Sequence, residues 1–245
     1  MFAGFLGLLA YRVYLLLPFM FKVFLVWLLL GSIVFLGALV GVRLRRGGFL
    51  LVFPAGYASV FKVFVFRFYR ILDSVLGGSR FLDVGAGVGD SCLYALLRGA
   101  SRVVCVEPDP LLARLARFNL AVNGFRGEVL EGCAGGACFL VDWARGAVRA
   151  SPGRPLGWGE LLSRGFDVVK VDCEGCEWTL EPRHIEMAPL WLVEVTGSLE
   201  RFLERVPGGY AYKVLYSGVD SATLQPSHLL LIARARHLRV PRQTL

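Results

Sequence analysis

The stretch FLDVGAGVGDS, residues 81–91, joins an apolar, strand-like start to three closely spaced glycines. Glycine at a turn between a strand and a helix lets the backbone approach a ligand closely, and the helix that follows attracts negative charge. A dinucleotide fingerprint would have its third glycine at position 90, which is Asp90, and would not require an acid on the strand. Asp83 supplies such an acid, which favours a ligand with a positive centre. The three glycines are Gly85, Gly87 and Gly89.

A second acidic side chain follows the next apolar stretch, VVCVEPDP, residues 103–110. Glu107 stands at the expected end of this strand, where an acid accepts hydrogen bonds from the hydroxyls of a ribose. Together with Asp83, Asp90 and the three glycines, Glu107 indicates a nucleoside that carries a cationic amino-acid tail. S-adenosylmethionine has these parts, and we expect it to be the cofactor.

Beyond residue 79 the apolar pattern alternates between strands and helices. We expect strands at 80–84, 102–106, 128–131, 138–141, 166–171, 190–195, 210–216 and 228–233, and helices at 91–98, 110–122, 160–163 and 198–205. Residues 145–159 are rich in glycine and proline and are expected to form a loop. Such alternation predicts an α/β fold with a mostly parallel sheet and helices on both faces.

Three acids are concentrated in VDCEGCEW, residues 171–178, directly after an apolar strand. Ligands of such sheets gather beyond the carboxyl ends of the strands, so these acids should face the reacting group. Asp172 and Glu174 are the predicted catalytic residues, which orient an acceptor hydroxyl or take its proton, and Asp172 also borders the cofactor. Glu177 is assigned to the following helix N-terminus, and a structural cap is the alternative for Glu174 as well.

The motifs FLDVGAGVGDS, VVCVEPDP, FNLAVNG and VKVDCEGCEW resemble the FkbM-type S-adenosylmethionine-dependent methyltransferases over roughly residues 79–196. Asp172, Glu174, Gly175 and Glu177 match the family signature Asp-x-Glu-Gly-x-Glu position by position. The resemblance implies a Rossmann-like class I methyltransferase with a seven-stranded sheet and O-methylation of sugars or other hydroxyl-bearing metabolites. Thr196 stands where members of the family often have histidine.

The chain has 245 residues, of which 56% are hydrophobic, and much of this excess lies in the first 70 positions. Residues 23–42 carry no charge and are long enough, as a helix, to cross roughly 30 Å of hydrocarbon. The arginines at 43, 45 and 46 favour a cytoplasmic C-terminal side. We therefore predict an apolar, helical, membrane-associated segment at 1–45, a lead-in at 46–78 and a cytoplasmic catalytic domain at 79–245. A helix buried against the domain or a partner chain is the alternative.

The net charge of +8 gives little support to nucleic-acid binding, because the sequence shows no basic stripe interleaved with aromatic residues. The six cysteines lie mostly in apolar runs, which is typical of small buried side chains. The alternative is a zinc site with four thiolate ligands or a redox pair, formed by Cys173 and Cys176 together with Cys133 and Cys138. No metal site is predicted.

The sequence thus predicts a membrane-associated S-adenosylmethionine-dependent methyltransferase that acts on a hydroxyl of a glycan, glycolipid or related metabolite. Two alternatives stand beside it. One is a catalytically inactive, membrane-associated protein that binds the cofactor. The other is a dinucleotide or nucleotide-sugar enzyme.

Overall fold

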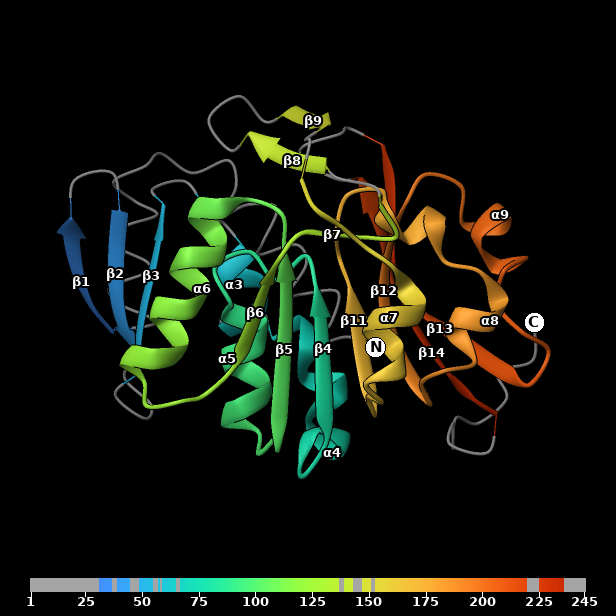
Figure 1. Ribbon diagram of the computed structural model, residues 1–245, viewed down its shortest axis with the longest axis horizontal. Coiled ribbons are helices and arrows are strands. Elements are labelled where there is room, and N and C mark those ends of the chain that lie inside the picture. The colour runs from blue at the N-terminus through green and yellow to red at the C-terminus, as the bar shows by residue number, and fades with distance from the viewer. Residues whose placement is uncertain are drawn as a thin grey trace.

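A seven-stranded sheet forms the centre of the protein, with its strands in the order β13-β14-β12-β11-β4-β5-β6 (Figure 1). A computed structural model describes residues 31–36, 39–44, 49–54, 57, 59–64, 67–136, 139–142, 147–150, 153–219 and 225–235. The strands of this sheet are β4 (Arg80–Val84), β5 (Arg102–Glu107), β6 (Glu128–Glu131), β11 (Val168–Val171), β12 (Leu190–Thr196), β13 (Tyr210–Val219) and β14 (Pro226–Arg234). β14 runs antiparallel to both of its neighbours, and the pairs from β12 to β6 are parallel. The mostly parallel sheet predicted from the sequence is confirmed.

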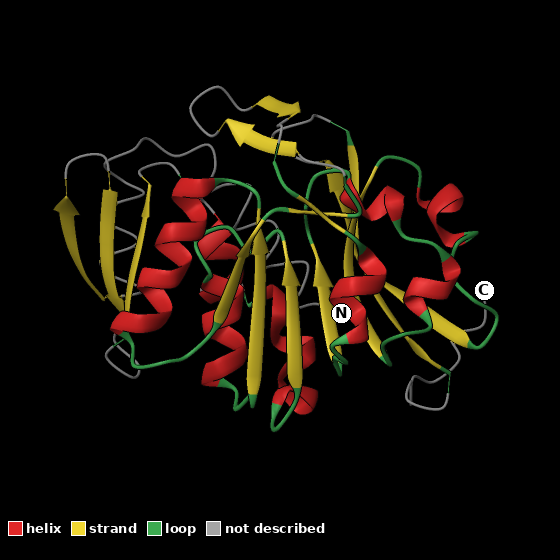
Figure 2. Ribbon diagram, in the orientation of Figure 1, coloured by secondary structure: helices red, strands yellow, loops and turns green. Residues whose placement is uncertain are grey.

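Helices cover both faces of the sheet (Figure 2). Phe81, Val103 and Val168 belong to one core cluster, and the next residue of each strand belongs to the other, because successive side chains alternate between faces. On the first face lie α3 (Ser59–Phe64), η1 (Phe68–Leu72), α4 (Asp73–Leu76), α5 (Asp90–Leu97) and α6 (Pro110–Val122). On the second face lie α7 (Trp158–Ser163), η2 (Cys176–Thr179), α8 (Pro182–Ile185) and α9 (Leu199–Leu203).

The clearest helix of the sequence, residues 110–122, is α6, with the predicted bounds. Its first turn explains why it begins there: the Asp109 carboxylate accepts hydrogen bonds from Leu111 N and Leu112 N, and Pro110 occupies the first helical position. The loop predicted at 145–159 is wrong in part. It contains β9 (Ala147–Ala150) and β10 (Pro155–Leu156), which pair with β8 (Phe139–Asp142) and β7 (Cys133–Ala134) outside the central sheet.

The helix predicted over residues 23–42 is wrong for the part that the structure describes. β1 (Gly31–Leu36) and β2 (Leu39–Leu44) form an antiparallel sheet with β3 (Leu50–Pro54). A continuous apolar run does not distinguish a helix from a buried strand, and the β-branched and aromatic residues of these segments favour strands. No helix among the described residues is long and apolar enough to span a membrane. Residues 1–30 lie outside the described residues, so the membrane association remains a prediction.

The lead-in is joined to the central domain by two asparagine side chains of α6. Asn119, fully buried, accepts from Val52 N at 2.8 Å and donates to Val52 O and Val88 O, both at 2.8 Å. Asn123 makes the same pair of bonds with Leu50: its side-chain oxygen accepts from Leu50 N, and its side-chain N–H donates to Leu50 O. The amides thus take the place of a neighbouring strand along β3, which satisfies backbone groups that burial would otherwise leave unpaired.

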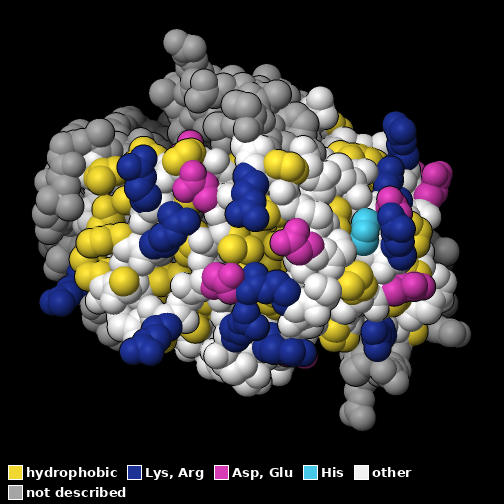
Figure 3. Space-filling view, viewed as in Figure 1, with side chains coloured by type: hydrophobic (Ala, Val, Ile, Leu, Met, Phe, Trp, Pro, Cys, Tyr) yellow, Lys and Arg dark blue, Asp and Glu magenta, His cyan; other side chains and the backbone are white. Residues whose placement is uncertain are grey.

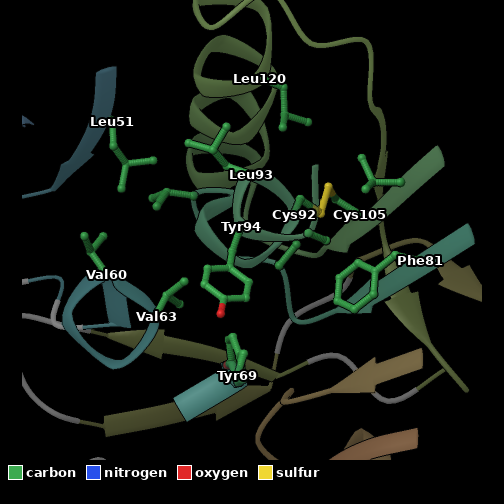
Figure 4. Close-up of a cluster of buried hydrophobic side chains, with 14 of the residues drawn as sticks. Leu51, Val60, Val63, Tyr69, Phe81, Cys92, Leu93, Tyr94, Cys105 and Leu120 are labelled. Carbon is green, nitrogen blue, oxygen red and sulfur yellow. A yellow bond between two sulfur atoms is a disulfide. The ribbon is translucent and has the colours of Figure 1, made fainter. Parts of the chain in front are cut away.

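The apolar side chains of the lead-in complete the core of the first face (Figure 4). Leu51, Val60 and Val63 are fully buried in the same cluster as Leu93 and Leu120. Burying a side chain of this size stabilises the fold by roughly 2 kcal/mol, so the lead-in contributes substantially to the stability of the central domain.

Candidate functional site

The glycine loop, residues 85–89, lies at the carboxyl end of β4 and leads into α5. Gly85, Gly87 and Gly89 all have positive φ, between 53° and 78°. A Cβ added to Gly85 would lie 1.8 Å from the carbonyl oxygen of Asp172, and one added to Gly87 would lie 1.8 Å from Tyr57 Oη. Glycine is therefore required at both positions, because the loop packs directly against the backbone of Asp172 and the ring of Tyr57.

Glu107 ends β5 beside the glycine loop, as predicted. Its carboxylate accepts hydrogen bonds from Gly87 N at 2.8 Å and from Asp109 N at 2.9 Å. Burial raises the pKa of Glu107 to about 7, and the two backbone N–H groups oppose this rise. The carboxylate thus shapes the loop and stands where the hydroxyls of a ribose were expected.

Asp90 begins α5 at the end of the glycine loop and is 1% exposed. Its Oδ2 atom is buried and has no hydrogen-bond partner among the residues that the structure describes. Burial raises the pKa of Asp90 to about 7. A buried carboxylate oxygen without a donor is costly, and a donor or a positive charge from a ligand would relieve that cost.

Asp83 lies in β4 with its side chain fully buried, and it pairs with a lysine that the sequence analysis did not single out. Lys170 Nζ, on β11, lies 2.8 Å from Asp83 Oδ1 and 3.2 Å from Gly85 O. Ser91 Oγ donates a hydrogen bond to the other carboxylate oxygen. Lys170 is itself buried, which lowers its pKa, but the charges of Asp83 and Asp172 outweigh burial and raise the pKa overall. Asp83 therefore contacts protein groups that support the loop, and its direct contact with a cofactor stays a prediction.

Asp172 follows β11 and is the centre of a second polar cluster. Its Oδ2 atom lies 3.4 Å from Tyr69 Oη and 3.9 Å from Lys170 Nζ. Burial would raise the pKa of Asp172, but the charges of Lys170 and Lys62 and hydrogen bonds with Glu194 and Tyr69 lower it. The side chain is 18% exposed, so a ligand can reach a carboxylate that is ionised at neutral pH.

Glu194 extends this cluster from β12. Its Oε1 atom accepts a hydrogen bond from Ser227 Oγ at 2.8 Å, and its Oε2 atom lies 3.7 Å from Lys62 Nζ. Asp172 and Glu194 also share a hydrogen bond, so the two carboxyl groups and Lys62 belong to one polar cluster.

The remaining acids of the signature lie in the acidic loop, residues 172–177. Glu177 is fully buried, and its carboxylate accepts from Gly175 N at 2.7 Å and from Thr196 N at 3.1 Å. Burial raises the pKa of Glu177 to about 7. The predicted structural role agrees with the bond to Gly175, the N-cap residue of η2, whereas the bond to β12 was not foreseen. Glu174 has φ 54°, and its catalytic role stays a prediction.

The structure brings the predicted cofactor residues and Asp172 to one edge of the sheet and adds side chains that the sequence analysis missed. The added residues are Tyr57, Lys62, Tyr69, Ser91 and Lys170. One signal was present in the sequence: a lysine inside the strand VVKV is the kind of buried charge that requires an acidic partner. The described residues contain no group of three or more histidines, cysteines or acids arranged to hold a metal ion.

The arrangement fits a nucleoside with a cationic tail. Asp90 offers a buried oxygen with no partner in the described part of the chain, Glu107 offers a carboxylate at the position predicted for the ribose, and the glycine loop offers a backbone that a ligand can approach. The order of the strands argues against the dinucleotide alternative. In a dinucleotide-binding sheet all six strands are parallel, and the sixth lies beside the fifth. Here β12 takes the place of the fifth strand, and its neighbour β14 runs antiparallel to it.

The chain is similar to proteins of one broad class. A ribosomal protein L11 methyltransferase from Synechococcus elongatus is 29% identical over 124 residues, which are 41% of this chain and 42% of that protein. One from Sorangium cellulosum is 31% identical over 124 residues, 45% of this chain and 38% of that protein. SMU.776, provisionally assigned as a methyltransferase and solved with SAH, matches with a TM-score of 0.50 and 10% identity over 82% of this chain and 57% of that chain. The fold is that of the class I methyltransferases.

No protein-family model matches the chain, so the closer likeness to the FkbM-type enzymes stays a prediction. The chain spans about two fifths of the length of the Synechococcus and Sorangium relatives. The order of the sheet and the likeness to SMU.776 thus establish the class I methyltransferase fold.

Proposed function

We propose that this protein is an S-adenosylmethionine-dependent methyltransferase. The observation that carries the proposal is the contact between the glycine loop and the acidic loop, in which Gly85 lies against the backbone of Asp172. This contact brings together, at one edge of the sheet, the loop that holds Asp90 beside Glu107, which we assign to the cofactor, and Asp172, which we assign to the acceptor. When bound, the cofactor supplies an electrophilic methyl group on a sulfonium, and buried carboxylates favour a ligand of that charge.

We propose a hydroxyl as the acceptor, on a glycan, a glycolipid or a related metabolite. Asp172 is ionised at neutral pH and partly exposed, so it can accept a hydrogen bond from such a hydroxyl and hold its oxygen toward the methyl group. A carboxylate with a lowered pKa is a weak base, so orientation contributes more than proton removal before the transfer. The proton released on transfer passes to the Asp172 carboxylate, which is partly exposed and can release it to solvent.

A lipid-linked acceptor would suit the apolar residues 1–30 and a location on the cytoplasmic face of a membrane. Fractionation of the full chain tests this location: recovery from the membrane fraction supports it, and recovery without detergent from the soluble fraction contradicts it. The likeness to ribosomal protein L11 methyltransferases makes protein L11 the second acceptor to assay.

The test is a pair of variants with opposite expected defects. Asp172→Asn should keep the affinity for S-adenosylmethionine and slow methyl transfer by about 100-fold, because the amide is nearly isosteric but carries no charge. Glu107→Ala should weaken cofactor binding, because the ribose loses its acceptor. Binding is measured by calorimetry, and transfer by single turnover from methyl-labelled cofactor to a glycan and lipid extract or to protein L11.

Three results separate the alternatives. Binding of NAD but not of S-adenosylhomocysteine would restore the dinucleotide enzyme. Cofactor binding without transfer to any acceptor would favour the inactive binding protein. Full transfer by Asp172→Asn would remove Asp172 from the reaction and leave the acidic loop as a structural element.

A further inference from the structure

A disulfide between Cys173 and Cys176 closes a ring of four residues within the acidic loop. The two residues inside the ring have unusual backbones: Glu174 has φ 54° and Gly175 has φ 126°. Glu174 is not a glycine, and a left-handed backbone at such a residue persists only where its surroundings hold it. The ring supplies such a constraint, because it ties the residues on either side of Glu174 and Gly175 together.

The ring lies between the two acids that organise the site. Asp172 directly precedes Cys173, and its backbone packs against Gly85. Glu177 directly follows Cys176, and its carboxylate joins Gly175 N to Thr196 N at the end of β12. A change in the ring therefore reaches both the acceptor residue and the bond between β12 and the loop.

A second disulfide offers a comparison within the same chain. Cys92 and Cys105 join α5 to β5, both are fully buried, and Figure 4 shows their bond inside the apolar core. Cys173 is only partly buried. In thiol–disulfide exchange, an attacking thiolate must reach one sulfur in line with the disulfide bond. A reductant should therefore reduce the partly exposed Cys173–Cys176 bond before the buried Cys92–Cys105 bond.

We propose that Cys173–Cys176 is a redox site. A dithiol reductant switches the enzyme there from an active form with the ring closed to a slow form with the ring open, and this inference rests on the proposed methyl transfer. The reductant thiolate attacks Cys173 Sγ, the bond to Cys176 breaks, and Cys176 leaves as a thiolate that takes up a proton. The second thiol of the reductant then attacks its own mixed disulfide and releases Cys173. The products are two cysteine thiols and one oxidised, cyclic disulfide.

Glu177 suits the second step of this exchange. Its Oε2 atom lies 3.7 Å from Cys173 Sγ, the sulfur released last. Because burial raises the pKa of Glu177 to about 7, this carboxyl group can carry the proton that the departing thiolate takes up at neutral pH. Ring opening then removes the constraint on Glu174, and the loop loses the arrangement that holds Asp172 beside Tyr69 and Lys170.

The experiment uses the full, oxidised chain and graded dithiothreitol, followed by alkylation and mass spectrometry of each cysteine. We expect Cys173 and Cys176 to become alkylated before Cys92 and Cys105. In the same samples, hydrogen–deuterium exchange of residues 172–180 should increase. Methyl transfer should fall by at least tenfold with little change in cofactor affinity, and reoxidation should restore it.

Matched variants assign the effect to this bond. Cys173→Ser/Cys176→Ser should transfer methyl groups as slowly as the reduced protein and should not respond further to dithiothreitol. Cys92→Ala/Cys105→Ala should keep the response. The proposal is overturned if the core bond is reduced first, if exchange of the loop is unchanged on reduction, or if the double serine variant is as active as the oxidised protein.

Alkylation and exchange do not depend on methyl transfer, so they test the switch even if the proposed function fails. A loop that opens on reduction in a protein that never transfers a methyl group would refute the proposed function and keep the ring as a redox site. An active enzyme whose rate ignores the state of the ring would keep the function and refute the switch.

Discussion

Lys170→Met tests the buried charge cluster that joins the two loops. Lys170 Nζ lies 2.8 Å from Asp83 Oδ1 and 3.9 Å from Asp172 Oδ2, and its side chain is 3% exposed. At an effective dielectric constant of about 20, these separations correspond to attractions of about 6 and 4 kcal/mol, and desolvation of the charges offsets much of the sum. Methionine keeps the apolar stem but leaves the fully buried Asp83 without a cation. We expect the variant to lose about 3–5 kcal/mol of unfolding free energy.

Urea unfolding followed by circular dichroism measures this loss. With a slope of about 2 kcal/mol per molar urea, the midpoint should fall by about 1.5–2.5 M. Asp83→Asn/Lys170→Met should recover more than half of the loss, because the double variant buries no unpaired charge at this pair. Arg80→Met is the matched control, since the Arg80–Asp167 pair is about half exposed on both sides and should contribute less than about 1 kcal/mol.

Two results would refute the reasoning. A midpoint shift of less than about 0.5 M in Lys170→Met would show that the cluster contributes little to stability. A double variant as unstable as the single one would show that the cost does not come from the orphaned carboxylate of Asp83.

Three further predictions follow from single contacts. Gly85→Ala should prevent the glycine loop and the acidic loop from packing together, because the added Cβ would lie 1.8 Å from Asp172 O. Calorimetry should then find no cofactor binding, and retained binding would contradict the close contact. Burial holds the pKa of Asp90 and of Glu107 at about 7, so the free protein should lose stability as pH rises from about 4 to 7, while cofactor affinity should rise about tenfold or more between pH 6 and 8. Equal affinity at both pH values would show that neither acid must ionise. Asn119→Leu should lower the free energy of unfolding by about 2–4 kcal/mol and increase hydrogen exchange in β3, because two backbone carbonyls and one backbone N–H lose their partner. Unchanged exchange would show that other contacts hold β3 against the central domain.

On the face shown in Figure 3, basic and acidic side chains are interspersed, and the prediction on nucleic-acid binding stays a prediction. Glu128 bridges Arg102 and Arg164, and Arg117 lies 3.8 Å from Glu131. Arginines that already face carboxylates on their own surface are less able to form the continuous positive stripe that a phosphate backbone requires.

The positions of the predicted cofactor residues follow from local sequence alone. A strand, a glycine turn and a helix can be identified from a dozen residues, and parallel strands bring their carboxyl ends to the same edge. This is why Gly85, Asp90, Glu107 and Asp172 could be predicted to lie near one another. The helix at 110–122 could be predicted to the residue, because its capping residue and its apolar period agree.

The tertiary structure decided what those residues touch. Lys170 pairs with Asp83, 87 positions earlier, and Tyr69 reaches Asp172 across 103 positions, and no local pattern encodes such separations. The same limit explains why a helix was wrongly predicted over the residues of β1 and β2. An apolar run is compatible with a helix and with a strand, and the strand forms where a neighbouring strand provides hydrogen-bond partners. Sequence periodicity determines which face of an element is buried, whereas the partner on that face depends on how the whole chain packs.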